Sequence, residues 1–156
     1  MKDIEVSVLI ANYNNQKYLP ECIESIKKQT YQNIEIIIHD DFSSDDSIKS
    51  ITRYKNIKII KHKKRGKYGS YNQINAYYRA FKKSRGKVIF FLDSDDLFKK
   101  DKIKIVINTF LKNKKMSSLF DLPIIKYEKK LKFIKNKKKI ISNYWPYIPP
   151  QSCIVM

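Results

Sequence analysis

Short apolar runs alternate with segments of helical periodicity along most of this chain, and few folds accept that order. Four runs rich in β-branched residues predict strands, at Val6–Ala11, Ile34–Ile38, Ile57–Ile60 and Val88–Leu92, and the first two are expected to be buried. Helices are expected over about 18–29, in a short stretch ending near Tyr54, over 71–83 and in a stretch beginning near Lys100. Short connections between alternating strands and helices favour an α/β fold with a mostly parallel, Rossmann-like sheet flanked by helices.

The helix expected over 71–83 has an apolar side. On that side, with the period of a helix, recur Ile74, Tyr77, Tyr78 and Phe81. The preceding stretch, Lys61–Gly69, is basic and contains glycine, so it is interpreted as a loop.

Polar clusters follow three of the four predicted strands. They are Ala11–Asn15, His39–Asp41 and Asp93–Asp96. In parallel α/β sheets, ligands bind just beyond the carboxyl ends of the strands. We therefore expect these three clusters to meet in space, although long stretches of sequence separate them.

The cluster Asp93–Asp96 places three carboxylates within four residues. Like charges at such close spacing repel one another unless a cation lies among them. Carboxylate oxygens are hard ligands that suit Mg²⁺ or Mn²⁺, and both ions keep positions for water and substrate phosphates. The alternative is an aspartate-rich turn that caps the helix beginning near Lys100.

The acids after the second predicted strand suggest recognition of a base. A carboxylate at Asp41 can accept a hydrogen bond from the N3–H of a uracil ring. The alternative is an acid in a turn or helix cap, and this alternative is stronger for Asp40. We interpret His39 as a strand residue that faces the core or a helix, and His62 as an exposed side chain of the basic loop.

Four segments resemble family 2 glycosyltransferases with the GT-A fold. They are Val6–Asn14, Leu19–Tyr31, Glu35–Asp45 and Gly86–Asp96. The first resembles the opening strand and loop of the family, and the second its first helix and SQTY ending. The third and fourth resemble the segments EIIVVDDGSTD and GEYIxFLDSDD. The resemblance runs from about Val6 to Phe110.

The resemblance implies a site for a nucleotide sugar and a divalent metal, Mn²⁺ or Mg²⁺. Asp41 would contact uracil, Asp93 ribose or the metal, and Asp95 the metal that bridges the diphosphate. The implied contacts of the nucleotide sugar are Ala11, Tyr13, Asp41, Gln73, Asp93 and Ser94. The implied metal ligands are Asp93, Asp95 and Asp96.

The chain departs from the family pattern in three places. Ala11 and Asn12 stand where the family often has Pro-Thr. Phe42 replaces the usual glycine after the two acids, so the backbone of that loop is expected to differ or to avoid positive φ. The segment 66–75 resembles the nucleotide-contacting loop only loosely, which leaves Lys67 and Tyr68 either as contacts or as parts of an exposed basic loop.

The resemblance also implies the reaction. Family 2 enzymes move a sugar from a nucleotide-diphosphate donor, here a UDP-sugar, to a glycan or lipid-linked acceptor by a metal-assisted inverting displacement. Their general base usually lies further along the domain, and the late acids Asp121 and Glu128 have no recognisable context. The alternatives are a truncated, inactive nucleotide-sugar-binding remnant and a basic nucleic-acid-binding module. Because no nucleic-acid motif is recognisable, we expect no nucleic-acid partner.

The net charge of +18, from 33 Lys+Arg against 15 Asp+Glu, favours anionic partners. A phosphate-bearing substrate and an anionic membrane surface both fit it, and the lysine run Lys126–Lys139 is either a solvated surface or a membrane contact. No secretory signal is visible, and Cys22 and Cys153 form no CxxC pattern. We therefore expect a cytoplasmic location, with a peripheral position at the inner membrane face also open.

The regular alternation fades beyond about Met116. The sequence predicts a nucleotide-sugar-binding core over 1–115, followed over 116–156 by a basic segment and the start of an incomplete acceptor-side region. The last residues, Cys153–Met156, resemble the beginning of a strand, so we expect a truncated chain.

Overall fold

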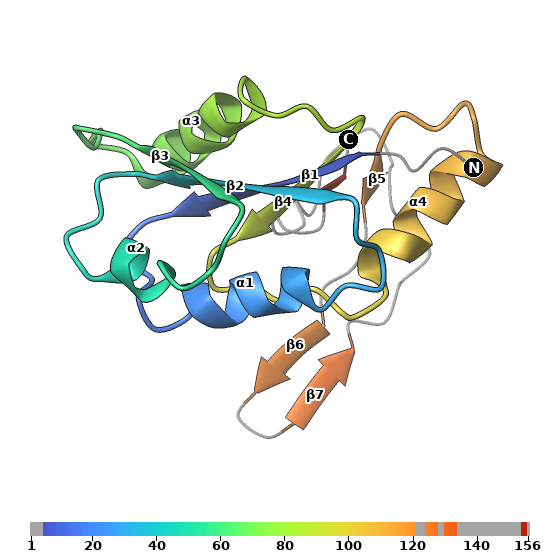
Figure 1. Ribbon diagram of the computed structural model, residues 1–156, viewed down its shortest axis with the longest axis horizontal. Helices are drawn as coiled ribbons and strands as arrows, with labels where there is room; N and C mark the ends of the chain where they lie inside the picture. The colour runs from blue at the N-terminus through green and yellow to red at the C-terminus, as the bar shows by residue number, and fades with distance from the viewer. Residues whose placement is uncertain (1–4, 121–123, 128–129, 134–153, 156) are drawn as a thin grey trace.

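Four parallel strands form the centre of the protein, and helices lie on both of their faces (Figure 1). The structure is a computed structural model that describes residues 5–120, 124–127, 130–133 and 154–155. The core elements are, in chain order, β1 (Val6–Asn12), α1 (Leu19–Lys27), β2 (Ile34–Asp40), α2 (Ser47–Ser50), β3 (Ile57–Lys61), α3 (Gly69–Phe81), β4 (Val88–Asp93) and α4 (Lys102–Lys112). All four predicted strands are confirmed, each within two residues of its expected end.

The sheet has the strand order β3-β2-β1-β4-β8-β5. Strands β1 to β4 pair in parallel, which confirms the predicted mostly parallel α/β sheet. The strands β5 (Leu119–Phe120) and β8 (Ile154–Val155) extend the sheet beyond β4, and β8 runs antiparallel to both neighbours. The expected strand character of Cys153–Met156 is thus confirmed at Ile154 and Val155.

The alternation of side chains along each strand divides the core into two layers. Val8 and Phe90 point to the face covered by α1, α2 and α4, where the larger apolar cluster lies. Leu9 and Phe91 point to the opposite face, which α3 covers (Figure 1). In the chain order, β1 connects outward to β2 and β3, whereas β4 lies on the other side of β1. A ligand crevice is expected at such a switch point, beyond the ends of β1 and β4.

The apolar side predicted for the helix over 71–83 does not face the sheet. Of its four residues only Tyr77 is buried, whereas Ile74, Tyr78 and Phe81 are exposed. The sheet is contacted instead by a side that carries Ala76 and Ala80, whose small side chains let the helix approach closely. The periodic pattern predicted the helix correctly but predicted the wrong side of it to face the sheet.

A buried glutamine holds the loop after β4. The side chain of Gln29, at the end of α1, donates from Nε2 to the carbonyl of Lys99 at 2.7 Å. Its Oε1 accepts from the backbone N–H of Ile103 at 3.1 Å, in the first turn of α4. The first N–H groups of a helix have no partner within the helix. Gln29 accepts from one of them, that of Ile103, and so fixes where α4 begins.

The basic segment is described only in part. The strands β6 (Ile124–Tyr127) and β7 (Lys130–Phe133) form an antiparallel hairpin that contains the first part of Lys126–Lys139. The remainder of that run, together with Asp121 and Glu128, lies outside the described residues. The division of the chain near residue 115 stays a prediction. Among the helices of the described part, none combines the length and apolarity that crossing a bilayer requires.

Candidate functional site

A cavity of about 320 Å³ lies where the ends of β1 and β4, the loop after β2 and the start of α3 meet. Most of the residues predicted for the site line it together: Ala11, Tyr13, Asp41, Gln73, Asp93, Ser94 and Asp95. Asp96 is not among the lining residues. The expected meeting of strand ends is therefore present in the structure.

The register of the sheet explains why Asp93 points into this cavity. Asp93 pairs with Ala11 across β1 and β4, and its side chain lies on the α3 face like Ile89 and Phe91. Its Oδ1 accepts two hydrogen bonds, from Gln73 Nε2 at 2.7 Å and from the Tyr77 hydroxyl at 2.6 Å. These bonds orient the carboxylate through Oδ1, and Oδ2 accepts neither of them.

Burial raises the pKa of Asp93, and the nearby carboxylates of Asp96 and Asp95 act in the same direction. The hydrogen bonds from Tyr77 and Gln73 oppose this shift only in part. A charged Asp93 is therefore destabilised in its present surroundings, and a cation beside it would relieve that cost.

The residues around Asp95 test whether a divalent metal fits the site. Asp95 is exposed and lines the cavity next to Asp93. Within the described part of the chain, no three His, Cys, Asp or Glu side chains are grouped to hold a metal by themselves. Two carboxylates suit Mg²⁺ or Mn²⁺ when phosphate and water oxygens complete the coordination, so the donor set fits an ion that arrives with an anionic ligand.

Ser94 is buried, and its hydroxyl is bound within the protein. It accepts a hydrogen bond from Asn15 Nδ2 at 2.5 Å. The backbone N–H of Asn15 in turn donates to Ser47 Oγ at 2.9 Å. This chain of contacts joins the loops after β1, β2 and β4, so the position of Ser94 is fixed before any ligand enters.

Asp41 has two basic neighbours at the other end of the cavity. Its Oδ2 lies 3.0 Å from Arg65 Nε, and its Oδ1 lies 3.5 Å from His62 Nδ1. The guanidinium carbon of Arg65 lies 3.5 Å from the centre of the Tyr13 ring, which is a stacking distance. Three planar groups, the Tyr13 ring, the Arg65 guanidinium and the Asp41 carboxylate, therefore lie together at this end of the cavity.

Two expectations, one about the basic loop and one about the loop after β2, are corrected. His62 is half-buried against Asp41 and is not simply exposed, because the loop folds back over the end of β2. Phe42 adopts a φ of 64° and does not avoid the left-handed region. Lys67 and Tyr68 are exposed and do not line the cavity.

Sequence reasoning missed Arg65 and Asn72. Arg65 belongs to a run of basic residues in which nothing distinguishes it from its neighbours. Asn72 shapes the same loop, because its side chain accepts from Gly66 N at 3.2 Å and donates to Gly66 O at 2.8 Å. Asn72 is buried in the structure, but nothing in the sequence distinguishes it from the exposed polar residues around it.

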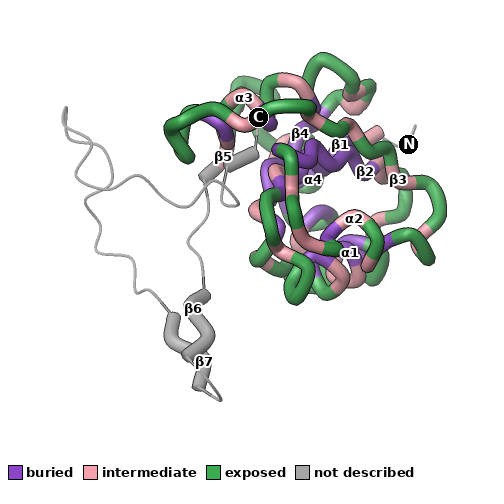
Figure 2. Tube along the Cα trace, turned by 90° about the vertical axis from the view of Figure 1, so that its left-hand side faces the viewer, coloured by how far each residue is buried: buried purple, intermediate pink, exposed green. Residues whose placement is uncertain are grey.

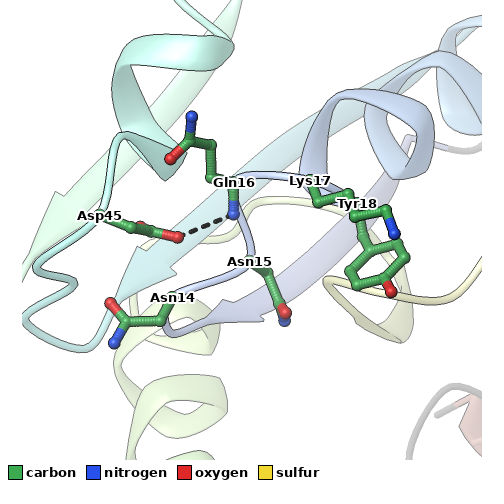
Figure 3. Close-up of a pocket in the computed structure, with 6 residues that line it drawn as sticks. All are labelled: Asn14, Asn15, Gln16, Lys17, Tyr18 and Asp45. Carbon is green, nitrogen blue, oxygen red and sulfur yellow. Dashed lines mark hydrogen bonds between the residues drawn. The ribbon is translucent and has the colours of Figure 1, made fainter.

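A second concavity, of about 340 Å³, lies on the outer side of the loop after β1 (Figure 3). Asp45 faces Gln16 there, and the Gln16 N–H donates to Asp45 Oδ2 at 2.9 Å. The Gln16 side chain also accepts from Asp46 N at 3.2 Å. These bonds lie within the protein and tie two loops together, so we interpret this concavity as structural.

Comparisons with known proteins identify the family. The sequence profile described as Glycosyl transferase family 2 matches residues 7–151. An uncharacterized glycosyltransferase of Nostoc is 34% identical over 78% of this chain and 38% of its own length. The Escherichia coli protein WfaP, described as a UDP-Glc:alpha-D-GlcNAc-diphosphoundecaprenol beta-1,3-glucosyltransferase, is 40% identical over 71% of this chain and 43% of its own length. The chain thus spans about two fifths of these relatives.

The fold also has solved counterparts. The structure of S. aureus TarS, residues 1–349, in complex with UDP has a TM-score of 0.68 and covers 92% of this chain and 40% of that one. Its sequence identity of 20% limits the likeness to the fold. The profile match over most of the residues, the relatives and the Rossmann-like GT-A architecture show that this chain belongs to glycosyl transferase family 2.

Proposed function

We propose that this chain binds a UDP-sugar and takes part in transferring the sugar to a glycan or lipid-linked acceptor. The observation that carries the proposal is the meeting of Asp41, Asp93 and Asp95 in one cavity at the switch point of the sheet. Family membership supports the donor and acceptor classes. So do WfaP and a second similar Escherichia coli protein, WfgD, which are both described as using UDP-Glc and a lipid-linked diphosphoundecaprenol acceptor.

The base is held at the end of the cavity that contains Asp41. The Asp41 carboxylate accepts a hydrogen bond from the N3–H of uracil. Cytosine has no hydrogen on N3, so Asp41 selects uracil over cytosine. Tyr13 and Arg65 supply planar surfaces beside it. Ala11, with its small side chain between the ends of β2 and β4, leaves room for the nucleotide.

The diphosphate is held at the opposite end. Asp95 and the open oxygen of Asp93 would bind Mn²⁺ or Mg²⁺, and Asp96 adds negative charge to the same cluster. When bound, the ion supplies Lewis-acid assistance by neutralising charge on the departing diphosphate. Tyr77 and Gln73 keep the Asp93 carboxylate in position for that contact.

Inversion at the sugar requires a general base that takes the proton of the acceptor hydroxyl. Each carboxylate that the structure places in the cavity already has a role in donor binding in this proposal. The second candidate is therefore a nucleotide-sugar-binding protein without catalysis. We place the protein in the cytoplasm, where a peripheral position at the inner membrane face would bring it to a lipid-linked acceptor.

Calorimetric titration of UDP tests the donor and metal assignments together. The wild-type chain is expected to bind UDP in the presence of Mn²⁺ and to bind it at least about tenfold more weakly without the ion, because the diphosphate then faces uncompensated carboxylates. CDP, ADP and GDP are expected to bind more weakly than UDP. Release of UDP from a UDP-sugar in the presence of an acceptor separates the transferase from the second candidate.

The decisive variant is Asp95→Ala, with Asp101→Ala as its matched control. Asp101 is an exposed aspartate on the same loop, six residues further on and away from the cavity. We expect Asp95→Ala to lose the effect of Mn²⁺ and Asp101→Ala to keep it. If Asp95→Ala binds UDP and Mn²⁺ as well as the wild type does, the metal assignment is wrong.

A further inference from the structure

The outward side of α3 carries a stripe of large apolar side chains. Tyr71, Ile74, Tyr78 and Phe81 are 65%, 58%, 55% and 49% exposed. Their spacing of three, four and three residues puts them in one row along the helix. Along α3, exposed residues alternate with buried ones, as the colours of the tube in Figure 2 show. We call this row the α3 stripe; a continuous apolar row on a surface helix marks a contact site more often than isolated apolar residues do.

The surroundings of the α3 stripe are uniformly basic. From Ser47 to Leu92 the chain contains no Asp or Glu, whereas lysine and arginine recur throughout. This stretch includes the edge strand β3, the basic loop, the whole of α3 and most of β4. The apolar row therefore lies on a segment of chain whose charged side chains are all basic.

Specific contacts place cations along the α3 stripe itself. The Lys82 ammonium lies 4.7 Å from the centre of the Tyr78 ring. Lys58, from β3, donates to the backbone carbonyl of Lys83 at 3.1 Å, which brings a further cation to the carboxyl end of α3. At the amino end, the Lys67 ammonium lies 5.7 Å from the Tyr68 ring. Ammonium groups thus lie beside aromatic rings or backbone at both ends of the helix.

We propose that the α3 stripe is a docking surface for an anionic membrane. Tyrosine and phenylalanine side chains insert at the level of the lipid headgroups, and lysine and arginine bind lipid phosphates. A second copy of the chain fits less well, because a symmetric contact would bring the same cations of both copies together. The bilayer surface is the occupant that satisfies the apolar row and the positive charge at once.

The same helix connects this surface to the cavity. Asn72, Gln73 and Ala76 line the cavity from the inner side of α3, while Tyr71 and Ile74 lie on its outer side. A helix with its side chains is roughly 10 Å wide, so docking brings the cavity within about that distance of the headgroups. Only this link to a lipid-linked acceptor rests on the proposed function; the docking itself does not.

Sedimentation with vesicles tests the docking surface. Vesicles of phosphatidylcholine with phosphatidylglycerol are compared with vesicles of phosphatidylcholine alone. Two variants of the whole chain remove either apolar or charged groups, Ile74→Ser with Phe81→Ser and Lys82→Gln with Lys83→Gln. We expect each variant to lower partitioning to the anionic vesicles by roughly tenfold, and the wild type to partition weakly to neutral vesicles.

Matched controls come from α4, which also has exposed apolar and basic side chains. Ile105→Ser with Leu111→Ser and Lys104→Gln with Lys112→Gln remove the same kinds of groups from the opposite face. We expect both to partition like the wild type. All variants are checked for unchanged circular dichroism and UDP binding, so a failure of the donor proposal is seen separately.

Several results would overturn the assignment. One is that the α3 variants partition to anionic vesicles as strongly as the wild type does. Another is that the α4 controls lose as much partitioning as the α3 variants. Binding that disappears only when Lys126–Lys139 is deleted would move the contact to that segment. Displacement from the vesicles by a single-stranded oligonucleotide, with the same dependence on Ile74 and Phe81, would indicate a nucleic-acid partner instead.

Discussion

Asp40 and Asp41 are neighbours in the sequence and have different roles in the structure. Asp40 points to the α1 face, where its Oδ1 accepts from Asn12 Nδ2 at 2.7 Å and from Ser43 Oγ at 2.6 Å. Asp41 lies in the cavity with Arg65. The alternation of side chains separates the two, so that Asp40 holds the loop whereas Asp41 faces the cavity beside Arg65 and His62.

The next residue, Phe42, is held in a backbone conformation that suits glycine. Its φ is 64°, which costs an L-residue about 1–2 kcal/mol, and its ring is 56% exposed and so gains little from packing. Glycine adds about 0.5–1 kcal/mol of backbone entropy to the unfolded chain. We therefore expect Phe42→Gly to raise the free energy of unfolding by about 0.5–1 kcal/mol in urea titrations.

Asn56→Gly is the control for Phe42→Gly. Asn56 has a φ of 62°, but asparagine tolerates that region well, so this change is expected to alter stability less. A Phe42→Gly protein less stable than the wild type would mean that the exposed ring makes a contact that outweighs the strain. From the sequence, Phe42 meant either that the backbone of this loop differs from that of the family or that it avoids positive φ, and the second alternative is wrong. It could not weigh the hydrogen bonds of Asp40 and Ser43, which set the path of the loop.

At the scale of the elements, period and composition were sufficient to predict the four strands and their helices. Short runs rich in β-branched residues, bounded by polar and turn residues, favour strands. The side of α3 that packs was predicted wrongly, because Ala76 and Ala80 carry little hydrophobic weight in a periodic pattern. Close packing at those alanines brings the Tyr77 hydroxyl to Asp93, a contact that a pattern of apolar residues cannot reveal.

Gly86 shows how closely two elements approach each other. A Cβ at this position would lie 2.4 Å from both the backbone nitrogen and Oγ of Ser7 in β1. Gly86 N also donates to Ser7 Oγ at 2.8 Å, within a group that Glu35 completes. Because the backbone of a central strand cannot move aside, we expect Gly86→Ala to destabilise the protein by about 3 kcal/mol or more.

Gly69→Ala is the comparison that isolates this steric effect. A Cβ at Gly69 meets no heavy atom within 4 Å, and Gly69 begins α3, where alanine is the better helix former. Thermal or urea unfolding should show Gly69→Ala as neutral or slightly stabilising and Gly86→Ala as strongly destabilising. Equal stability of the two variants would mean that β1 and the turn before β4 are further apart than the structure has them.

For the whole molecule, the meeting of the strand ends was predictable, whereas the contacts among the side chains that line the cavity were not. A parallel sheet brings Asp41 and Asp93 to the same edge whatever the details of the loops. The pairing of Asp41 with Arg65 depends on how the loop after β3 folds back, and its sequence is a run of similar basic residues. The roles of these side chains in binding stay predictions until nucleotide titrations are made.

One buried histidine makes the stability of the whole molecule depend on pH. His39 is buried under α3, and neither of its ring nitrogens has a hydrogen-bond partner within the described residues. Burial lowers the pKa of His39 below its usual 6.5, and the positive charges of Arg79 and His62 act in the same direction. The negative charges of Asp41 and Asp40 oppose this shift without cancelling it.

The sign of the effect follows from proton linkage. Above pH 6.5 the imidazole is neutral in the folded and the unfolded chain, so this group contributes no pH dependence there. As the pH falls below 6.5, the unfolded chain takes up a proton that folded His39 resists. The free energy of unfolding is then expected to fall by up to about 1.4 kcal/mol per pH unit until the folded pKa is reached.

Urea unfolding of the wild type and of His39→Leu between pH 8 and pH 5 measures how much His39 contributes to the pH dependence of the free energy of unfolding. Leucine has a similar volume and leaves no buried polar atom, so its variant is expected to lose stability less steeply below pH 6.5. His62→Gln, which removes the neighbouring imidazole, should keep most of the wild-type slope because burial is the larger cause of the shift. Parallel pH profiles for the wild type and His39→Leu would mean that His39 takes up a proton in the folded state as readily as in the unfolded one, and α3 would then have to leave the sheet open to water above it.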